Sequence, residues 1–226
     1  MPDYFPAFLD VRGRRCLVAG GGAVAARKVE GLLACGARVV VVSPALVPAL
    51  EAVRAAGAIE HRARPFRKGD ARGCLLVIAA TGVAVVDAGI ADAARRHRAL
   101  VNAVDRPAHC DFIYGSVLRR GELQISVSTG GRAPALAREL RRRLEDVVGP
   151  EYADLVDEVG RARHAARAVA PTAAARLEAG ERVVAVALDR ATSPVAGQRA
   201  GRNTNRLLSA VPTKTRPWCS SSRRAP

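Results

Sequence analysis

Long apolar runs are absent from this chain of 226 residues. Its most apolar stretches, VVVVSP at residues 39–44 and CLLVIAATG at residues 74–82, are far shorter than the roughly 18 residues that a membrane helix requires. The first ten residues, MPDYFPAFLD, lack the basic segment and apolar core of a secretory signal. We therefore expect a soluble, cytoplasmic protein with no membrane partner.

Paired cysteines are also absent. The five cysteines are widely scattered and none belongs to a C-x-x-C pair, which argues against a disulfide framework and against a zinc site. We expect no metal site, and we expect reduced, mostly buried thiols at Cys16, Cys35, Cys74, Cys110 and Cys219.

Aromatic residues are scarce, at 4% of the chain, and this bears on the meaning of its charge. The formal net charge is +15, which by itself suggests a polyanionic partner. Eight positive charges, however, follow Asp189, the last acidic residue, in a tail rich in Ser, Pro, Gly and Arg that we expect to be disordered. Trp218 is the only aromatic residue in this tail, so nucleic acid is not the expected partner.

What is present, over the first half of the chain, is a regular alternation of strand and helix patterns. The expected strands include unbroken β-branched and apolar runs, which are typical of strands buried on both faces. Such alternation predicts a parallel α/β sheet of the Rossmann type. The expected strands are residues 14–19, 37–43, 59–66, 74–81 and 99–105, and the expected helices are residues 23–35, 44–57 and 85–98.

The pattern changes after Pro107. Residues 112–130 contain two strand-like segments joined through RRGE, which indicates a hairpin, and residues 132–148 have the apolar spacing of an amphipathic helix. A second, smaller unit is therefore expected to begin near residue 112, with further helix between residues 150 and 190.

A glycine cluster lies where the first strand meets the first helix. Gly20, Gly22 and Ala25 satisfy G-x-G-x-x-A in this position, where the glycines allow a tight turn and a close approach to a pyrophosphate. The phosphates would then meet the free N–H groups at the start of the helix. An ordinary strand-to-helix turn also uses glycines, but the strand–helix–strand context favours a dinucleotide site.

The acidic residue that usually ends the second strand of an NAD site is missing. Ser43 stands at that position and Pro44 follows it. A serine hydroxyl can bind a ribose, but it does not repel a 2′-phosphate. Ser43 therefore predicts a dinucleotide site with appreciable tolerance of NADP.

Asp105 is the candidate for proton transfer. It ends the last expected parallel strand, and ligands of open α/β sheets bind outside the carboxyl ends of the strands. A carboxylate there can accept a proton as hydride leaves a substrate. From the residues alone, a turn cap before Pro107 is the more common role of such an aspartate, and His109 is most simply an exposed loop residue.

With these segments in order, the chain resembles the precorrin-2 dehydrogenase and sirohydrochlorin ferrochelatase family, which forms the N-terminal module of siroheme synthase. The resemblance covers roughly residues 4 to 150. It departs from the family after residue 150 and at Thr129, where some relatives have Ser. The segments that carry it are FPAFLDVRGRRCLVAGGGAVAARKVEGLLACGARVVVVSP, IAAT, NAVDRPAHCDFIYGS and ISVSTGGRAPALARELRRRLE.

The resemblance implies an NAD-dependent oxidoreductase of siroheme and porphyrin biosynthesis, which oxidises precorrin-2, an anionic tetrapyrrole, to sirohydrochlorin. It also implies a homodimer and, in some members, a lyase activity that inserts ferrous iron as a second substrate. A module that senses dinucleotides without chemistry is the alternative function. Together, the resemblance and the sequence pattern predict an NAD-binding Rossmann-like domain at 1–111 and a dimerisation hairpin and helix at 112–149. Beyond the resemblance, the sequence pattern predicts a helical region at 150–190 and a basic, disordered tail at 191–226.

The resemblance also implies roles for individual residues. Asp105 would be the catalytic acid and base. The cofactor would contact Gly20, Gly22, Ala23 and Val24 at its pyrophosphate and Ser43, Pro44 and Ala45 on its adenosine side, and Thr81 is also assigned to it. Guanidinium groups suit the acetate and propionate groups of a tetrapyrrole, although they equally suit an exposed hairpin, and the candidates are Arg106, Arg119, Arg120 and Arg132.

Overall fold

The computed structural model describes residues 4–169 and 172–192. These residues divide into two compact units, which are treated separately below. The first unit contains the described residues up to Ser116 together with Ser126–Glu139, and the second contains Val117–Ile125 and the described residues from Leu140 onward. Nearly all of the expected basic tail, from residue 193, lies outside the described residues.

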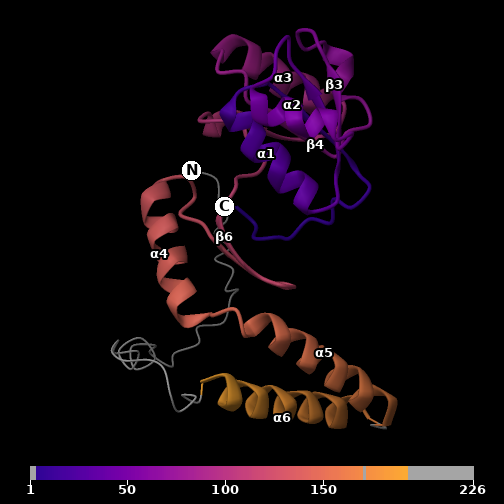
Figure 1. The fold of residues 1–226 in the computed structure, drawn as a ribbon, viewed down its shortest axis with the longest axis vertical. Helices are drawn as coiled ribbons and strands as arrows, with labels where there is room; N and C mark the ends of the chain where they lie inside the picture. The colour runs from indigo at the N-terminus through magenta and orange to yellow at the C-terminus, as the bar shows by residue number, and fades with distance from the viewer. Residues whose placement is uncertain (1–3, 170–171, 193–226) are drawn as a thin grey trace, which may run out of the picture. The chain divides into compact units, whose positions relative to one another are not determined.

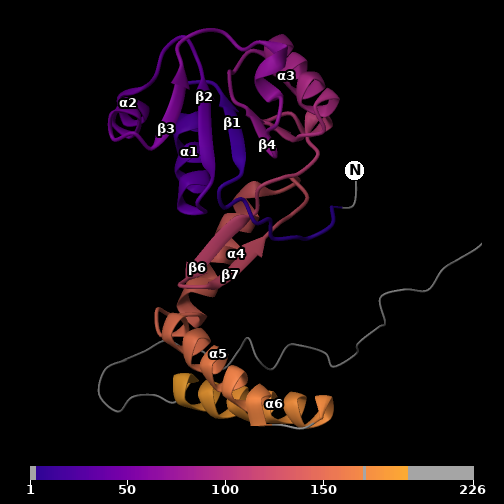
Figure 2. The ribbon, with the colours of Figure 1, turned by 90° about the vertical axis from the view of Figure 1, so that its right-hand side faces the viewer.

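The first unit is built on a five-stranded parallel sheet with the order β3-β2-β1-β4-β5 (Figure 2). This arrangement confirms the predicted Rossmann-like α/β fold. The change of direction lies between β1 and β4, where open sheets of this kind bind their ligands. The strands are β1 (Arg15–Ala19), β2 (Arg38–Val42), β3 (Ile59–Arg62), β4 (Leu76–Ala79) and β5 (Leu100–Ala103).

Three helices cover the two faces of this sheet (Figures 1 and 2). Helices α1 (Ala23–Ala34) and α2 (Pro48–Ala55) contribute to one buried cluster, which contains Cys16, and α3 (Ala84–Arg96) contributes to the other, which contains Cys74. Burial on both faces explains why the strands are apolar without alternation.

The ends of three neighbouring strands are alanines. Ala19, Ala79 and Ala103 close β1, β4 and β5, and they lie in register as Ala19 beside Ala79 and Ala79 beside Ala103. Each of them is at most 1% exposed. Because these side chains are small, a ligand can closely approach the backbone at the carboxyl edge of the sheet.

Some boundaries differ from the sequence expectations for local reasons. Helix α2 begins at Pro48 rather than residue 44, because proline is best tolerated in the first turn, where its missing N–H costs no helical bond. The segment after Arg62 leaves the sheet, and short 3-10 turns, η1 (Lys68–Ala71) and η2 (Pro107–His109), follow β3 and β5.

The rest of the chain follows the expected order. Strands β6 (Ser116–Arg120) and β7 (Leu123–Val127) form a two-stranded sheet, and α4 (Pro134–Val147) comes after it. Helices α5 (Tyr152–Val169) and α6 (Ala173–Thr192) pack against each other in the second unit (Figure 1). No helix within the described residues is both long enough and apolar enough to cross a membrane.

Candidate cofactor and substrate site

The glycine cluster forms a turn between β1 and α1, and the space available to a side chain differs at each glycine. Gly20 has φ +130°, and a Cβ there would collide with the Ala80 carbonyl oxygen. A Cβ at Gly21 would collide with the Ala45 carbonyl oxygen. A Cβ at Gly22, the N-cap of α1, would meet no atom within 4 Å. The first two glycines are therefore needed by the fold, whereas Gly22 borders open space.

That open space belongs to a hollow of about 280 Å³ at the carboxyl edge of the sheet. The first turn of α1 contains no acidic residue and has no capping side chain, so its N–H groups are available to an anion. A bound pyrophosphate would fit this arrangement. The hollow is lined by Gly20, Gly21, Gly22, Val42, Ser43, Pro44, Pro65, Phe66, Ala80, Thr81 and Val86.

Five of the predicted cofactor residues, Gly20, Gly22, Ser43, Pro44 and Thr81, thus line one hollow. The structure places the other three close by in the chain. Ala23 and Val24 are the first residues of α1, and Ala45 lies in the loop after β2.

Ser43 is 8% exposed and is held by three contacts. Its hydroxyl donates to the Ala45 carbonyl at 2.8 Å, its own carbonyl lies 2.9 Å from Nε2 of His61, and its N–H donates to the Arg62 carbonyl at 3.2 Å. A hydroxyl that donates inward presents lone pairs, and no negative charge, to the hollow. This geometry agrees with weak discrimination between NAD and NADP.

A buried ion cluster supports the opposite wall of the hollow. Asp70 is 4% exposed, and its oxygens accept hydrogen bonds from Arg62, from Arg64 and from the backbone N–H of Arg67 at 2.7 to 2.8 Å. Hydrogen bonds from Arg64 hold the pKa of Asp70 far below its usual range. The cluster fixes the segment that carries Pro65 and Phe66.

Asp105 lies two residues after the end of β5, with φ +56° in the left-handed region. It is exposed, and its carboxylate makes no hydrogen bond to any residue that the structure describes. The N-cap of the following turn is Arg106, so the capping alternative for Asp105 has no hydrogen bond to support it.

Lys28 is the cation associated with Asp105. Burial lowers the pKa of Lys28, as does the charge of Arg27, whereas the Asp105 charge raises it. The Lys28 ammonium lies over the ring of Tyr114, at 3.6 Å from its centroid, and burial raises the pKa of Tyr114. The ring of Phe112 meets Tyr114 edge-on, with centroids 5.4 Å apart. The carboxylate therefore lies near a cation that is itself held in place.

The predicted substrate-binding arginines fall into both units. Arg106 and Arg132 belong to the first, and Arg119 and Arg120 belong to the second. Nε of Arg120 donates to the Val148 carbonyl at 3.0 Å, so this side chain is partly committed to structure. Arg132 is exposed just before α4. His109 ends η2 and donates its backbone N–H to the Arg106 carbonyl.

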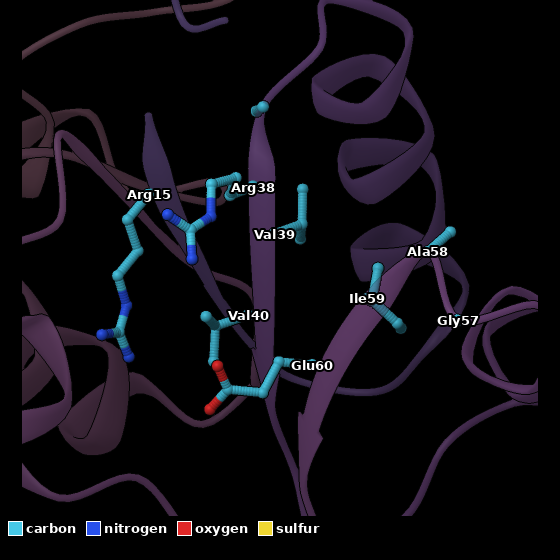
Figure 3. Close-up of a pocket in the computed structure, with 9 residues that line it drawn as sticks. Arg15, Arg38, Val39, Val40, Gly57, Ala58, Ile59 and Glu60 are labelled. Atoms are coloured by element: carbon cyan, nitrogen blue, oxygen red, sulfur yellow. The ribbon is translucent and has the colours of Figure 1, made fainter. Parts of the chain in front are cut away.

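A larger hollow, of about 450 Å³, lies at the opposite edge of the sheet, among the first residues of β1, β2 and β3. Figure 3 shows Arg15, Arg38 and Glu60 around it. Its lining includes Gly57 in the turn after α2 but no residue from the start of a described helix, and it lies at the edge opposite the strand ends that carry Asp105. The smaller hollow is therefore the dinucleotide candidate.

Several lining residues were not foreseen from the sequence. Gly21 could have been found as the middle glycine of the triplet. The sequence predicts a strand for Pro65 and Phe66 and a helix for Val86, and no motif in it links these residues to a ligand. Asp87 is 2% exposed and receives hydrogen bonds from Thr81. The sequence feature that could have identified Asp87 is an acidic residue within the apolar stripe of a helix.

Two family models match this chain. Residues 7–116 match a model described as putative NAD(P)-binding, and residues 120–146 match one described as sirohaem biosynthesis protein central. Within the described residues, no group of three or more His, Cys, Asp or Glu side chains gathers as a metal site would.

Curated relatives and a solved structure agree with these models. A siroheme synthase of Thioalkalivibrio sulfidiphilus is 45% identical over 153 residues (68% of this chain, 31% of the relative), and one of Methylococcus capsulatus is 39% identical over 182 residues (80% and 38%). Siroheme synthase 1 of Halorhodospira halophila is 37% identical over 199 residues (87% and 41%). The chain thus spans 31 to 41% of the length of these relatives. A solved structure named SirC, precorrin-2 dehydrogenase, has the same fold, with a TM-score of 0.68 and 21% identity over 80% of this chain and 89% of that one.

Proposed function

This chain belongs to the precorrin-2 dehydrogenase and sirohydrochlorin ferrochelatase family, and from that premise we propose that it oxidises precorrin-2 to sirohydrochlorin with NAD. The observation that carries the proposal is the position of two features at one edge of the sheet. The glycine turn with its open hollow follows β1, and Asp105 follows β5. Cofactor and base thus come from the same carboxyl edge.

Bound NAD supplies a hydride acceptor. The N–H groups of the first turn of α1 would hold its pyrophosphate beside Gly22, and Ser43 and Pro44 would contact the adenosine side. Loss of two electrons and two protons from the substrate requires a hydride to leave to the nicotinamide and a proton to leave to a base. Asp105 takes that proton, because its carboxylate is exposed and is not engaged in a hydrogen bond within the described part of the chain.

The substrate is an anionic tetrapyrrole, and arginines bind its carboxylates. Arg106 directly follows Asp105 and is 36% exposed, so it is the arginine best placed to orient a carboxylate beside the base. Arg119, Arg120 and Arg132 are the further candidates.

The active form is a homodimer built around the hairpin and α4. Leu136, Leu140 and Val147 on α4 are 51%, 40% and 47% exposed, and their spacing places them on one stripe of the helix. A second copy of this chain would cover that stripe. Cys16, Cys74 and Cys110 are free thiols, which suits the reducing cytoplasm that we propose as the compartment of this protein.

The test is to supply precorrin-2 and NAD to the wild type and to follow NADH at 340 nm together with the absorbance of sirohydrochlorin, about one NADH being expected per tetrapyrrole oxidised. Production of both supports the proposal. Binding of NAD without any NADH would instead support the sensing module. Incorporation of ferrous iron into sirohydrochlorin, measured separately, tests whether the protein also inserts the metal.

A further inference from the structure

Asp87 is a buried acid for which the proposed reaction has no use. It lies in the first turn of α3, and its side chain is 2% exposed. A carboxylate buried so fully is costly unless its charge and its oxygens have partners. The start of a helix supplies part of the compensation, because the helix dipole favours a negative charge there.

The two oxygens of Asp87 reach the ends of two neighbouring strands. Oδ1 accepts hydrogen bonds from the N–H of Thr81 at 3.1 Å and from its hydroxyl at 2.7 Å, and Thr81 comes two residues after β4. Oδ2 lies 4.0 Å from Nε of Arg106, which comes three residues after β5. One side chain therefore bridges the two strand ends on the β5 side of the sheet.

The Thr81 side of this bridge belongs to the cofactor hollow. Thr81 lines the hollow, and its hydroxyl donates to Asp87 while accepting the N–H of Val83 at 3.2 Å. With both roles of the hydroxyl occupied, the orientation of Thr81 depends on Asp87.

The Arg106 side belongs to the proposed substrate-binding residues. Arg106 is the only cation within ion-pair distance of Asp87 among the residues described. The contact is made through Nε, so the outer N–H groups of the guanidinium are available to a carboxylate. The pairing restricts the long Arg106 side chain next to Asp105.

We propose that Asp87 is a positioning residue that sets Thr81 against the cofactor and Arg106 against a carboxylate of the tetrapyrrole. The inference rests on the proposed function, because it takes the ligand of Arg106 to be the substrate. In this role Asp87 aligns the cofactor site, through Thr81 after β4, with the substrate site, through Arg106 after β5.

Two matched variants of the full chain separate the two sides of the bridge. Asp87→Asn keeps a carbonyl oxygen for Thr81 but has no charge for Arg106, so the KM for precorrin-2 should rise about fivefold while the Kd for NAD stays within about twofold of the wild type. Thr81→Val keeps the pair with Arg106 but removes the hydroxyl. It should raise the Kd for NAD about fivefold and leave the KM for precorrin-2 unchanged at saturating NAD.

A double-mutant cycle distinguishes positioning from general damage. In an Arg106→Gln background, Asp87→Asn should raise the KM no further, because it acts through Arg106. A KM increase of the same size in both backgrounds, or equal losses in NAD and precorrin-2 binding with a lowered melting temperature, would show a merely structural acid and overturn the inference. If the wild type forms no NADH, the proposed function fails and this inference fails with it. A fully active wild type with an unchanged KM in Asp87→Asn removes the inference alone.

Discussion

The ammonium nitrogen of Lys28 lies 3.6 Å from the centroid of the Tyr114 ring. Lys28 is on α1, the helix whose first turn faces the cofactor hollow, and Tyr114 follows the loop that begins with Asp105. The contact therefore ties the cofactor helix to the segment that carries the proposed base. Tyr114 is 45% exposed, and a cation over an exposed aromatic ring is worth about 0.5 to 1 kcal/mol.

Changing Tyr114 should test this contact. Tyr114→Phe keeps the ring and should leave the free energy of unfolding nearly unchanged, whereas Tyr114→Leu should lower it by about 1 kcal/mol. Urea unfolding measures both. In a Lys28→Met background the two variants should differ by less than in the wild type, and an undiminished difference would mean that the ring acts through packing alone.

Gly21 and Gly22 of the turn should behave differently when a side chain is added. Gly22→Val should still fold, because a Cβ at this position meets no atom within 4 Å, with a small loss of stability because valine is a poorer N-cap than glycine. It should lose NAD binding because the side chain enters the hollow. Gly21→Ala should unfold more easily, because its Cβ collides with the Ala45 carbonyl. Calorimetric titration and thermal melting measure the two effects, and unchanged NAD affinity in Gly22→Val would refute the phosphate position.

Asp105→Asn should remove the proposed base and preserve the backbone conformation at this position. Asparagine tolerates the left-handed conformation at φ +56°, so the fold and the affinity for NAD should be preserved. The rate of precorrin-2 oxidation should fall by about 10² to 10⁴. NADH formation at saturating substrates is the measurement, and a wild-type rate would reduce Asp105 to a turn residue.

Asp70 should make the protein sensitive to acid. Its pKa is lowered in the folded state, so its stabilising contribution is fully present above the pKa of about 4 that a free carboxyl has, and is lost as the pH falls below that value. Asp70→Asn should cost about 2 kcal/mol at pH 7 and should flatten the decline in acid. Urea unfolding from pH 7 to pH 3 checks this, with a substitution of the exposed Asp92, Asp92→Asn, as the control. Equal slopes in the wild type and Asp70→Asn would contradict it.

Leu140→Glu should weaken the proposed homodimer. The residue is 40% exposed on the apolar stripe of α4, and a charge there would be buried by the second copy. Light scattering at about 10 μM should give a dimer for the wild type and a monomer for the variant. Arg142→Glu, on the same helix but off the stripe, is the matched control, and a wild-type monomer would exclude the dimer at this concentration.

The sequence predicted the Rossmann-like sheet well because its signals are local. Buried strands of valine and isoleucine and a glycine triplet between strand and helix depend on near neighbours. The support of the site could not be predicted in this way. Phe66 lines the hollow in a segment that is held by the contacts of Asp70 with Arg62 and Arg64. Asp87, at the start of α3, contacts Arg106, which follows a different strand. Such contacts depend on the order of the strands, which no local pattern encodes.

The core contains one fully or nearly fully buried cysteine on each face of the sheet, so cysteine labelling can report local unfolding of each face separately. Cys16 is fully buried on the face covered by α1, where burial raises its pKa to about 11, and Cys74 is buried on the face covered by α3, where burial again raises its pKa. Labelling reagents react with the thiolate, and burial keeps these thiols protonated and inaccessible. Each cysteine should therefore react only when its own face of the sheet opens. Single-cysteine versions of the chain would therefore report, by their labelling rates with and without NAD, whether cofactor binding closes both faces of the sheet or only the one beneath α1.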